Sequence, residues 1–217
     1  MFQTLAARIF SLALLCTVCS AALAQEFSAD VFNTNTKDAV NGGKLYAKGS
    51  KIRVDGAGAS AGALAPMVIV DLEKNSLIIM DATNHAYMKS DIDAEANLSF
   101  FHLADANNAC PALNKMAGMQ NSCKKSGNES VNGHQTVKYS GKSEDGKPVQ
   151  IWVDPEVNFV VKWLKGGEAG ELRNIKVEPQ AASLFEVPAD YHNALKESGK
   201  DAGEKEEEDK KDPSPQQ

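Results

Sequence analysis

The chain has 217 residues, a net charge of −6 and 24% charged residues. This length is enough for one domain with a hydrophobic core. An acidic chain lacks the basic footprint that nucleic acids and anionic membrane surfaces require, so we expect neither as a partner.

The first 24 residues have the pattern of a cleaved export signal. Arg8 precedes a short apolar run, and Ala22 and Ala24 occupy the −3 and −1 positions before Gln25. The run is shorter than the roughly 20 apolar residues that span a bilayer, and no later segment reaches that length. We therefore expect cleavage between Ala24 and Gln25 and a soluble periplasmic product. Two early cysteines make lipid attachment the alternative, but they lack the small residues expected just upstream.

The rest of the chain up to residue 195 is typical of a β protein. Apolar or alternating runs are separated by Gly, Asn, Asp and Pro at short intervals, which predicts strands. Because short turns join antiparallel neighbours, we expect a mainly antiparallel sheet. The predicted strands are 27–34, 43–48, 50–55, 66–72, 76–81, 85–89, 127–131, 134–140, 148–153, 159–165 and 170–177.

Two predicted strands, 66–72 and 76–81, are apolar on both faces, whereas 50–55 alternates between apolar and polar residues. A strand that is apolar on both faces needs a cover on each side of its sheet. The central segment 91–119 can supply one cover. The other is a sheet that curves onto itself, a second layer or a bound apolar ligand.

The central segment lacks strand alternation. Pro111 suits the first turn of a helix, and Leu113 and Met116 recur three residues apart, so we expect one or two short helices. Cys110 and Cys123 are the cysteines beyond the signal, and an even number in an oxidising compartment predicts a disulfide. The alternatives are two free thiols or part of a metal site.

Residues 196–217 carry almost no apolar side chains and many charges. Such a segment cannot bury enough surface to offset the entropy of ordering it. We therefore divide the chain into a signal (1–24), a folded domain (25–195) and a disordered charged tail (196–217).

Catalytic signatures are missing from this sequence. The glycine-rich stretch 56–63 lacks the Lys-Ser/Thr of a phosphate loop, and no serine lies in a nucleophile elbow. The histidines His85, His102, His134 and His192 lack zinc-ligand spacing. We expect a protein that is not an enzyme, with no cofactor and no metal.

A known group of proteins shares a series of short stretches with this chain, namely 27–31, 43–46, 49–55, 68–71, 127–133, 151–155, 171–176 and 184–191. With these stretches the chain resembles the LolA-like and LolB-like periplasmic lipoprotein carriers, and most closely an allied bacterial domain group of unknown function. The arginines beyond the signal, Arg53 and Arg173, do not match the arginine that latches the carriers' lid.

The resemblance implies a mainly β (α+β) fold: one strongly curved, unclosed antiparallel sheet, a half-barrel, with short helices plugging its concave face. It also implies a non-catalytic binding protein that carries or senses a lipid, a lipoprotein acyl chain or another apolar ligand. The alternative is a structural or interaction module of the cell envelope, with a filled core and an envelope protein as partner. The residues predicted to line the cavity are Val31, Leu45, Ile52, Val54, Ile69, Ile79, Leu113 and Met116.

Overall fold

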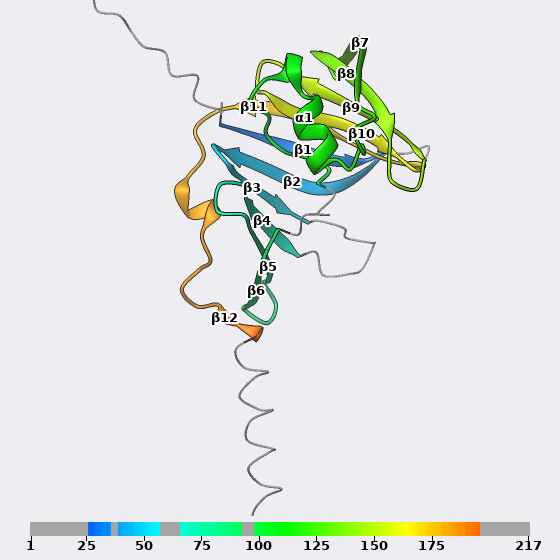
Figure 1. Cartoon of the computed structure of the whole chain (residues 1–217). Helices are drawn as coiled ribbons and strands as arrows, with labels where there is room; N and C mark the ends of the chain where they lie inside the picture. Colours follow the sequence, from blue (N-terminus) through cyan, green and yellow to red (C-terminus); the bar gives the residue numbers. More distant parts are fainter. Residues whose placement is uncertain (1–25, 36–38, 57–65, 93–97, 196–217) are drawn as a thin grey trace, which may run out of the picture.

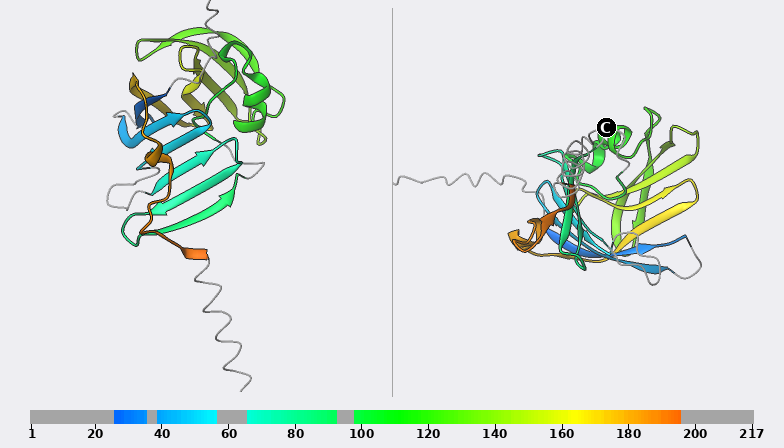
Figure 2. Two further views of the ribbon diagram at one scale, coloured as in Figure 1. Left: turned by 90° about the vertical axis from the view of Figure 1, so that its left-hand side faces the viewer. Right: turned by 90° about the horizontal axis from the view of Figure 1, so that it is seen from below.

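A computed structural model describes residues 26–35, 39–56, 66–92 and 98–195. These residues form one twelve-stranded sheet in the order β12-β6-β5-β4-β3-β2-β1-β11-β10-β9-β8-β7. Figures 1 and 2 show that the sheet bends into an open half-barrel, as the resemblance predicted. The strands are β1 (Phe27–Asn33), β2 (Val40–Lys48), β3 (Lys51–Asp55), β4 (Met67–Asp71), β5 (Ser76–Asp81), β6 (Ala86–Asp91), β7 (Lys124–Val131), β8 (His134–Lys142), β9 (Pro148–Asp154), β10 (Phe159–Lys165), β11 (Glu168–Val177) and β12 (His192–Asn193).

Tight turns produce the antiparallel order. Asn132 and Gly133, between β7 and β8, have φ values of 51° and 91°, and Gly166 and Gly167, between β10 and β11, have 59° and 93°. Two successive residues with positive φ are what a two-residue hairpin turn needs. The first strand, β1, pairs with both β2 and β11 and so joins the two halves of the sheet.

The concave face is plugged by two short helices, η1 (Ala106–Asn108) and α1 (Cys110–Met116), which confirms the helices predicted in this segment (Figure 1). Pro111 lies in the first turn of α1. A backbone N–H in this turn has no acceptor within the helix, so a proline, which lacks the N–H, sacrifices no hydrogen bond there. A disulfide joins Cys110 to Cys123. Leu113 is fully buried in the main core cluster, together with Phe101 and Phe159.

The convex face is covered in part by the segment that follows β11. This segment includes η2 (Ala182–Phe185) and is seen in orange beside the sheet in Figure 1. Two side chains of the sheet form hydrogen bonds with the backbone of this segment. Lys48 Nζ donates to the Gln180 carbonyl (2.9 Å), and Arg53 Nη1 donates to the Leu184 carbonyl (2.9 Å). Ile69 is the cross-strand partner of Arg53, so it lies on this face and not on the concave one.

The end of this segment adds one more strand to the sheet. Residues 192–193 form β12, which pairs in parallel with β6. The sheet is therefore mixed, but the other strand pairs of the described residues are antiparallel, in agreement with the mainly antiparallel sheet that was expected. A parallel pair forms because the chain reaches the free edge of β6 after crossing the convex face, and not through a tight turn.

Three sequence predictions fall on residues that are not described: the signal with its Ala24–Gln25 junction, most of the glycine-rich stretch 56–63, and the tail 196–217. Within the described ranges, no helix has the length and apolar character needed to cross a membrane.

Candidate functional site

A row of apolar side chains crosses the concave face from β2 to β6. Leu45, Val54, Val68, Ile79 and Met88 are successive cross-strand partners, and directly paired residues point to the same side of a sheet. Their exposure increases along the row. Leu45 is 0% exposed, the next three are half-buried, and Met88 is 45% exposed.

The next row shows the same gradient. Ala47, Ile52 and Val70 are buried, Leu77 is half-buried, and the polar Ser90 ends the row on β6. The concave face thus remains apolar beyond the part that is fully buried. We call Val54, Val68, Leu77, Ile79 and Met88 the apolar trough.

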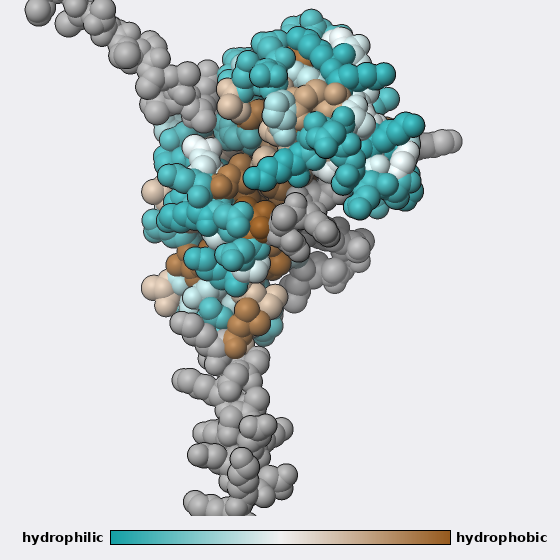
Figure 3. Space-filling model, in the orientation of Figure 1, coloured by the Kyte–Doolittle hydropathy of each residue, from teal (hydrophilic) through white to brown (hydrophobic). Residues whose placement is uncertain are grey.

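The surface agrees with this pattern. Figure 3 shows hydrophobic surface over the middle strands of the sheet, bordered by hydrophilic side chains. A large exposed apolar side chain such as Met88 is informative when it continues a row of other apolar residues, because isolated ones are common. The trough is a contiguous apolar strip of the concave face.

The residues predicted to line a cavity occupy three environments. Of the eight, Val54 and Ile79 lie in the trough. Buried or half-buried positions of the main core are occupied by Val31, Leu45, Ile52, Leu113 and Met116. Ile69 lies on the convex face, on the side of η2. Alternation could not assign its face, because β4 is apolar on both sides.

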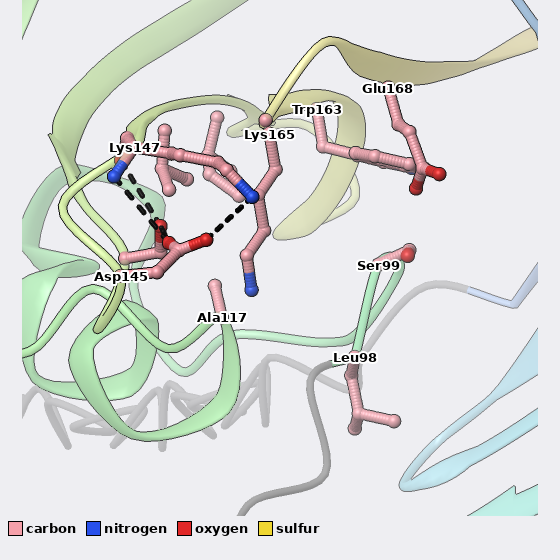
Figure 4. Close-up of a pocket in the computed structure, with 12 residues that line it drawn as sticks. Leu98, Ser99, Ala117, Asp145, Lys147, Trp163, Lys165 and Glu168 are labelled. Carbon is pink, nitrogen blue, oxygen red and sulfur yellow. Dashed lines mark hydrogen bonds and ion pairs between the residues drawn. The ribbon is translucent and has the colours of Figure 1, made fainter.

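A separate cavity of about 360 Å³ lies between the plug and two hairpin connections (Figure 4). Its lining is part apolar and part charged. None of the eight predicted residues lines it. Its side chains come from the plug segment and from the β8–β9 and β10–β11 hairpins, and the approach of these three parts depends on the bend of the sheet. The lining residues are Leu98, Ser99, Ala117, Ser143, Asp145, Lys147, Val149, Ile151, Trp163, Lys165, Gly166 and Glu168.

The charged groups of this cavity differ in their partners. Asp145 is paired with Lys147 (2.7 Å) and accepts a hydrogen bond from Ser143 Oγ (2.5 Å). These two contacts hold the pKa of the Asp145 carboxyl far below its usual range, and the contact with Lys147 has the larger effect. Asp145 in turn raises the pKa of Lys147. Both groups stay charged, and a carboxylate with so low a pKa is a poor general base.

Lys165 is different. Its ammonium group points into the cavity in Figure 4, and no carboxylate lies within ion-pair distance of it among the residues described. The floor below it includes Val149 and Ile151 from β9. A free cation above an apolar floor is suited to an anionic group attached to an apolar body.

The two arginines do not contact the plug in the described structure. Arg53 pairs with Asp55 (2.6 Å) and binds the Leu184 carbonyl, while Arg173 pairs with Glu171 (2.7 Å) and lies over the Phe32 ring. Both sets of contacts are on the convex side of the sheet, so neither arginine acts as a latch over the concave face here.

Comparison with known proteins supports the fold. No protein-family model and no curated protein matches the chain. An uncharacterized conserved protein from Thermus thermophilus is similar in structure, with a TM-score of 0.52 and 9% identity over 79% of this chain and 91% of that chain. The open, curved sheet with a plug on its concave face is the half-barrel that the sequence resemblance predicts.

Two further solved structures are similar at lower scores. PNGF-II matches with a TM-score of 0.47 and 12% identity over 82% of this chain and 33% of its own length. MucB in the Pseudomonas aeruginosa MucA/MucB complex matches with a TM-score of 0.35 and 11% identity over 77% of this chain and 57% of that chain. At such identities a likeness concerns the fold, and function is argued from the site.

Proposed function

We propose that this chain is an exported, non-catalytic binding protein that holds an acyl chain or a similar apolar ligand against the apolar trough. The observation that carries the proposal is the row from Val54 to Met88, which continues the core out to a partly exposed edge without a change to polar residues. Burial of hydrocarbon against this row would remove apolar surface of both partners from water.

The size of the row suits a single acyl chain. Strands lie about 4.8 Å apart, so the three spacings from β3 to β6 make about 14 Å. One leaflet of a bilayer, half of a hydrocarbon core about 30 Å thick, is about 15 Å deep. The open part of the trough is therefore about as long as one leaflet's acyl chain.

The expected energy suits a carrier that releases its ligand. Burial of a CH₂ group gains about 0.8 kcal/mol, so half-covering a C16 chain gains roughly 6 kcal/mol. Part of that gain is lost to the entropy of association. Binding of this strength is weak and reversible, as a carrier or sensor requires.

Export is supported by the disulfide between Cys110 and Cys123, because such bonds persist in oxidising compartments. With the signal pattern in residues 1–24, it supports a periplasmic location for the domain 25–195, followed by the charged tail 196–217. A binding role is favoured over catalysis because the charged cavity groups Asp145 and Lys147 neutralise each other.

The second candidate is an envelope interaction module without a small ligand. One observation favours it: β7 is an edge strand of eight residues, all exposed except Val131. An exposed strand edge can accept a strand from a partner protein. Lys124 and Lys125 on this edge also discourage unspecific pairing, which is a common use of lysine on edge strands.

The test is native mass spectrometry of the protein purified from its periplasm under mild conditions, with extraction and identification of lipids. We expect a stoichiometric adduct that organic solvent removes. A bare mass that is unchanged after incubation with fatty acids or an acylated lipoprotein would reject the acyl-chain proposal and favour the interaction module.

A matched pair of variants locates the ligand. Ile79 and Ile78 are neighbours on β5 and both half-buried, but Ile79 is in the trough and Ile78 faces the convex side with Ile69. We expect Ile79→Asn to lose the adduct and Ile78→Asn to keep it. Equal retention by both variants would place the ligand elsewhere, the cavity at Lys165 being the next site to test.

A further inference from the structure

A cluster of metal-ligand side chains lies where β8 begins and β9 ends. His134 follows the turn between β7 and β8, Asp154 is the last residue of β9, and Glu156 lies in the turn that follows. Within the described ranges, one ligand atom from each of the three lies within 4.8 Å of the other two. The β8–β9 register, in which Val137 opposes Val153, brings the cluster together across the two hairpins.

The carboxylate of Asp154 is the centre of this cluster. The residue is 1% exposed. Its Oδ1 accepts the backbone N–H of Glu156 (2.8 Å), which fixes the orientation of the carboxylate. Its Oδ2 lies 2.8 Å from His134 Nδ1, within ion-pair distance, and no hydrogen bond to this oxygen is seen among the described residues. A buried carboxylate oxygen without a donor is costly unless a cation compensates it.

The geometry points to a binding site for a divalent first-row transition cation of the Zn²⁺ type, held by His134 Nδ1, Asp154 Oδ2 and a Glu156 carboxylate oxygen. One imidazole nitrogen with carboxylate oxygens is a ligand set that Zn²⁺ accepts, and two carboxylates balance its charge. Three protein ligands leave the fourth tetrahedral position to water. The Glu156 N–H, which donates to Asp154 Oδ1, would hold this carboxylate in the orientation that binds the ion.

The distances allow an ion with a small adjustment. Ligand atoms about 2.1 Å from a tetrahedral ion are about 3.4 Å from each other. The 2.8 Å between His134 Nδ1 and Asp154 Oδ2 must therefore widen slightly. His134 has 27% of its side chain exposed and can rotate, whereas Asp154 is held by its backbone contact.

This site is independent of the proposed ligand trough. Asp154 lies on the same face of β9 as Trp152, the partner of Lys138, and that face is opposite to Tyr139 and the plug. A bound ion would connect the turn between β7 and β8 to the turn between β9 and β10, and so would brace this end of the sheet.

The test uses the exported protein without a polyhistidine tag, stripped with a chelator and dialysed against Zn²⁺. We expect one Zn²⁺ per chain and a higher melting temperature with the ion, because a ligand that binds the folded state stabilises it. His134→Gln and Glu156→Gln each remove one ligand at an accessible position. Each substitution should weaken Zn²⁺ binding by more than roughly 10- to 100-fold, which is the typical cost of losing a hydrogen bond that only supports a metal ligand.

The chain offers a matched control. His85 and Asp190 form a second His–Asp pair at the same 2.8 Å, but both side chains are more than half exposed, and no third ligand joins them among the described residues. His85→Gln should bind Zn²⁺ like the unaltered protein. The proposal is overturned if no stoichiometric ion binds, or if His85→Gln lowers binding as much as His134→Gln does.

Discussion

The hydroxyl of Tyr139 fastens the plug to the sheet. It donates a hydrogen bond to the Ala106 carbonyl (2.7 Å) and accepts one from the backbone N–H of Ala109 (3.3 Å). Tyr139 is a fully buried residue of β8; Ala106 is the first residue of η1, and Ala109 lies between η1 and α1. One side chain of the sheet thus satisfies two backbone groups of the segment that covers it.

Tyr139→Phe removes both of these bonds without changing the shape of the ring. It leaves a buried carbonyl and a buried N–H without this partner, so we expect a loss of about 1–3 kcal/mol in the free energy of unfolding. Urea denaturation measures it. Tyr46→Phe is the control, since no hydrogen bond of the Tyr46 hydroxyl is seen among the described residues. Equal stability of the two variants would contradict the role given to Tyr139.

The disulfide should contribute a similar amount of stability. Cys110 and Cys123 are 13 residues apart, and the chain-entropy model assigns a loop of about this size roughly 3 kcal/mol. We expect reduction to lower the melting temperature of the unaltered protein. The double variant Cys110→Ser/Cys123→Ser should start at the lower temperature and should not respond to the reductant. A response of this variant would show that the reductant acts elsewhere.

Trp163 requires a glycine beside it. A Cβ on Gly170 would lie 2.7 Å from the indole Nε1 and 3.0 Å from Cε2. Overpacking of this kind costs about 1–3 kcal/mol, so Gly170→Ala should unfold at a lower urea concentration. Gly42→Ala is the matched control, because its Cβ would meet nothing nearer than 3.7 Å.

A double-mutant cycle checks this explanation. If the clash with the indole is the cause, Trp163→Leu combined with Gly170→Ala should cost less than the sum of the two single changes. Strict additivity would mean that Gly170 is required for another reason, such as its place in β11.

His102 should make stability depend on pH. Burial lowers its pKa below the usual 6.5, more strongly than its hydrogen bond with the Asn158 backbone raises it. The unfolded chain therefore binds more protons than the folded one below about pH 6.5, and stability falls as the pH is lowered. The slope is limited to about 1.4 kcal/mol per pH unit for one proton.

The measurement is urea denaturation between pH 7.5 and pH 5, above the range in which the carboxylates with lowered pKa values are protonated. In His102→Phe, which keeps a ring beside Phe27 and Phe159, this slope should be smaller. An unchanged slope would assign the effect to another group.

The strands, and the hairpins that join neighbours in the chain, follow from local patterns in the sequence. The turn residues Asn132 and Gly133 adopt positive φ almost regardless of context, so the neighbours they join can be predicted. The disulfide, the short helices at Pro111 and the need to cover strands β4 and β5 on both sides were also predicted from residue types. All of these depend on backbone conformation or on residues close in the chain.

The tertiary structure alone decides which side chains face each other across the bend. Ile69 and Ile79 look alike in the sequence, but they lie on opposite faces, because β4 and β5 are apolar on both sides and alternation cannot choose between them. His134 and Asp154 likewise approach each other only through strand pairing. Contacts between residues far apart in the chain depend on the register and curvature of the whole sheet, which no local pattern encodes.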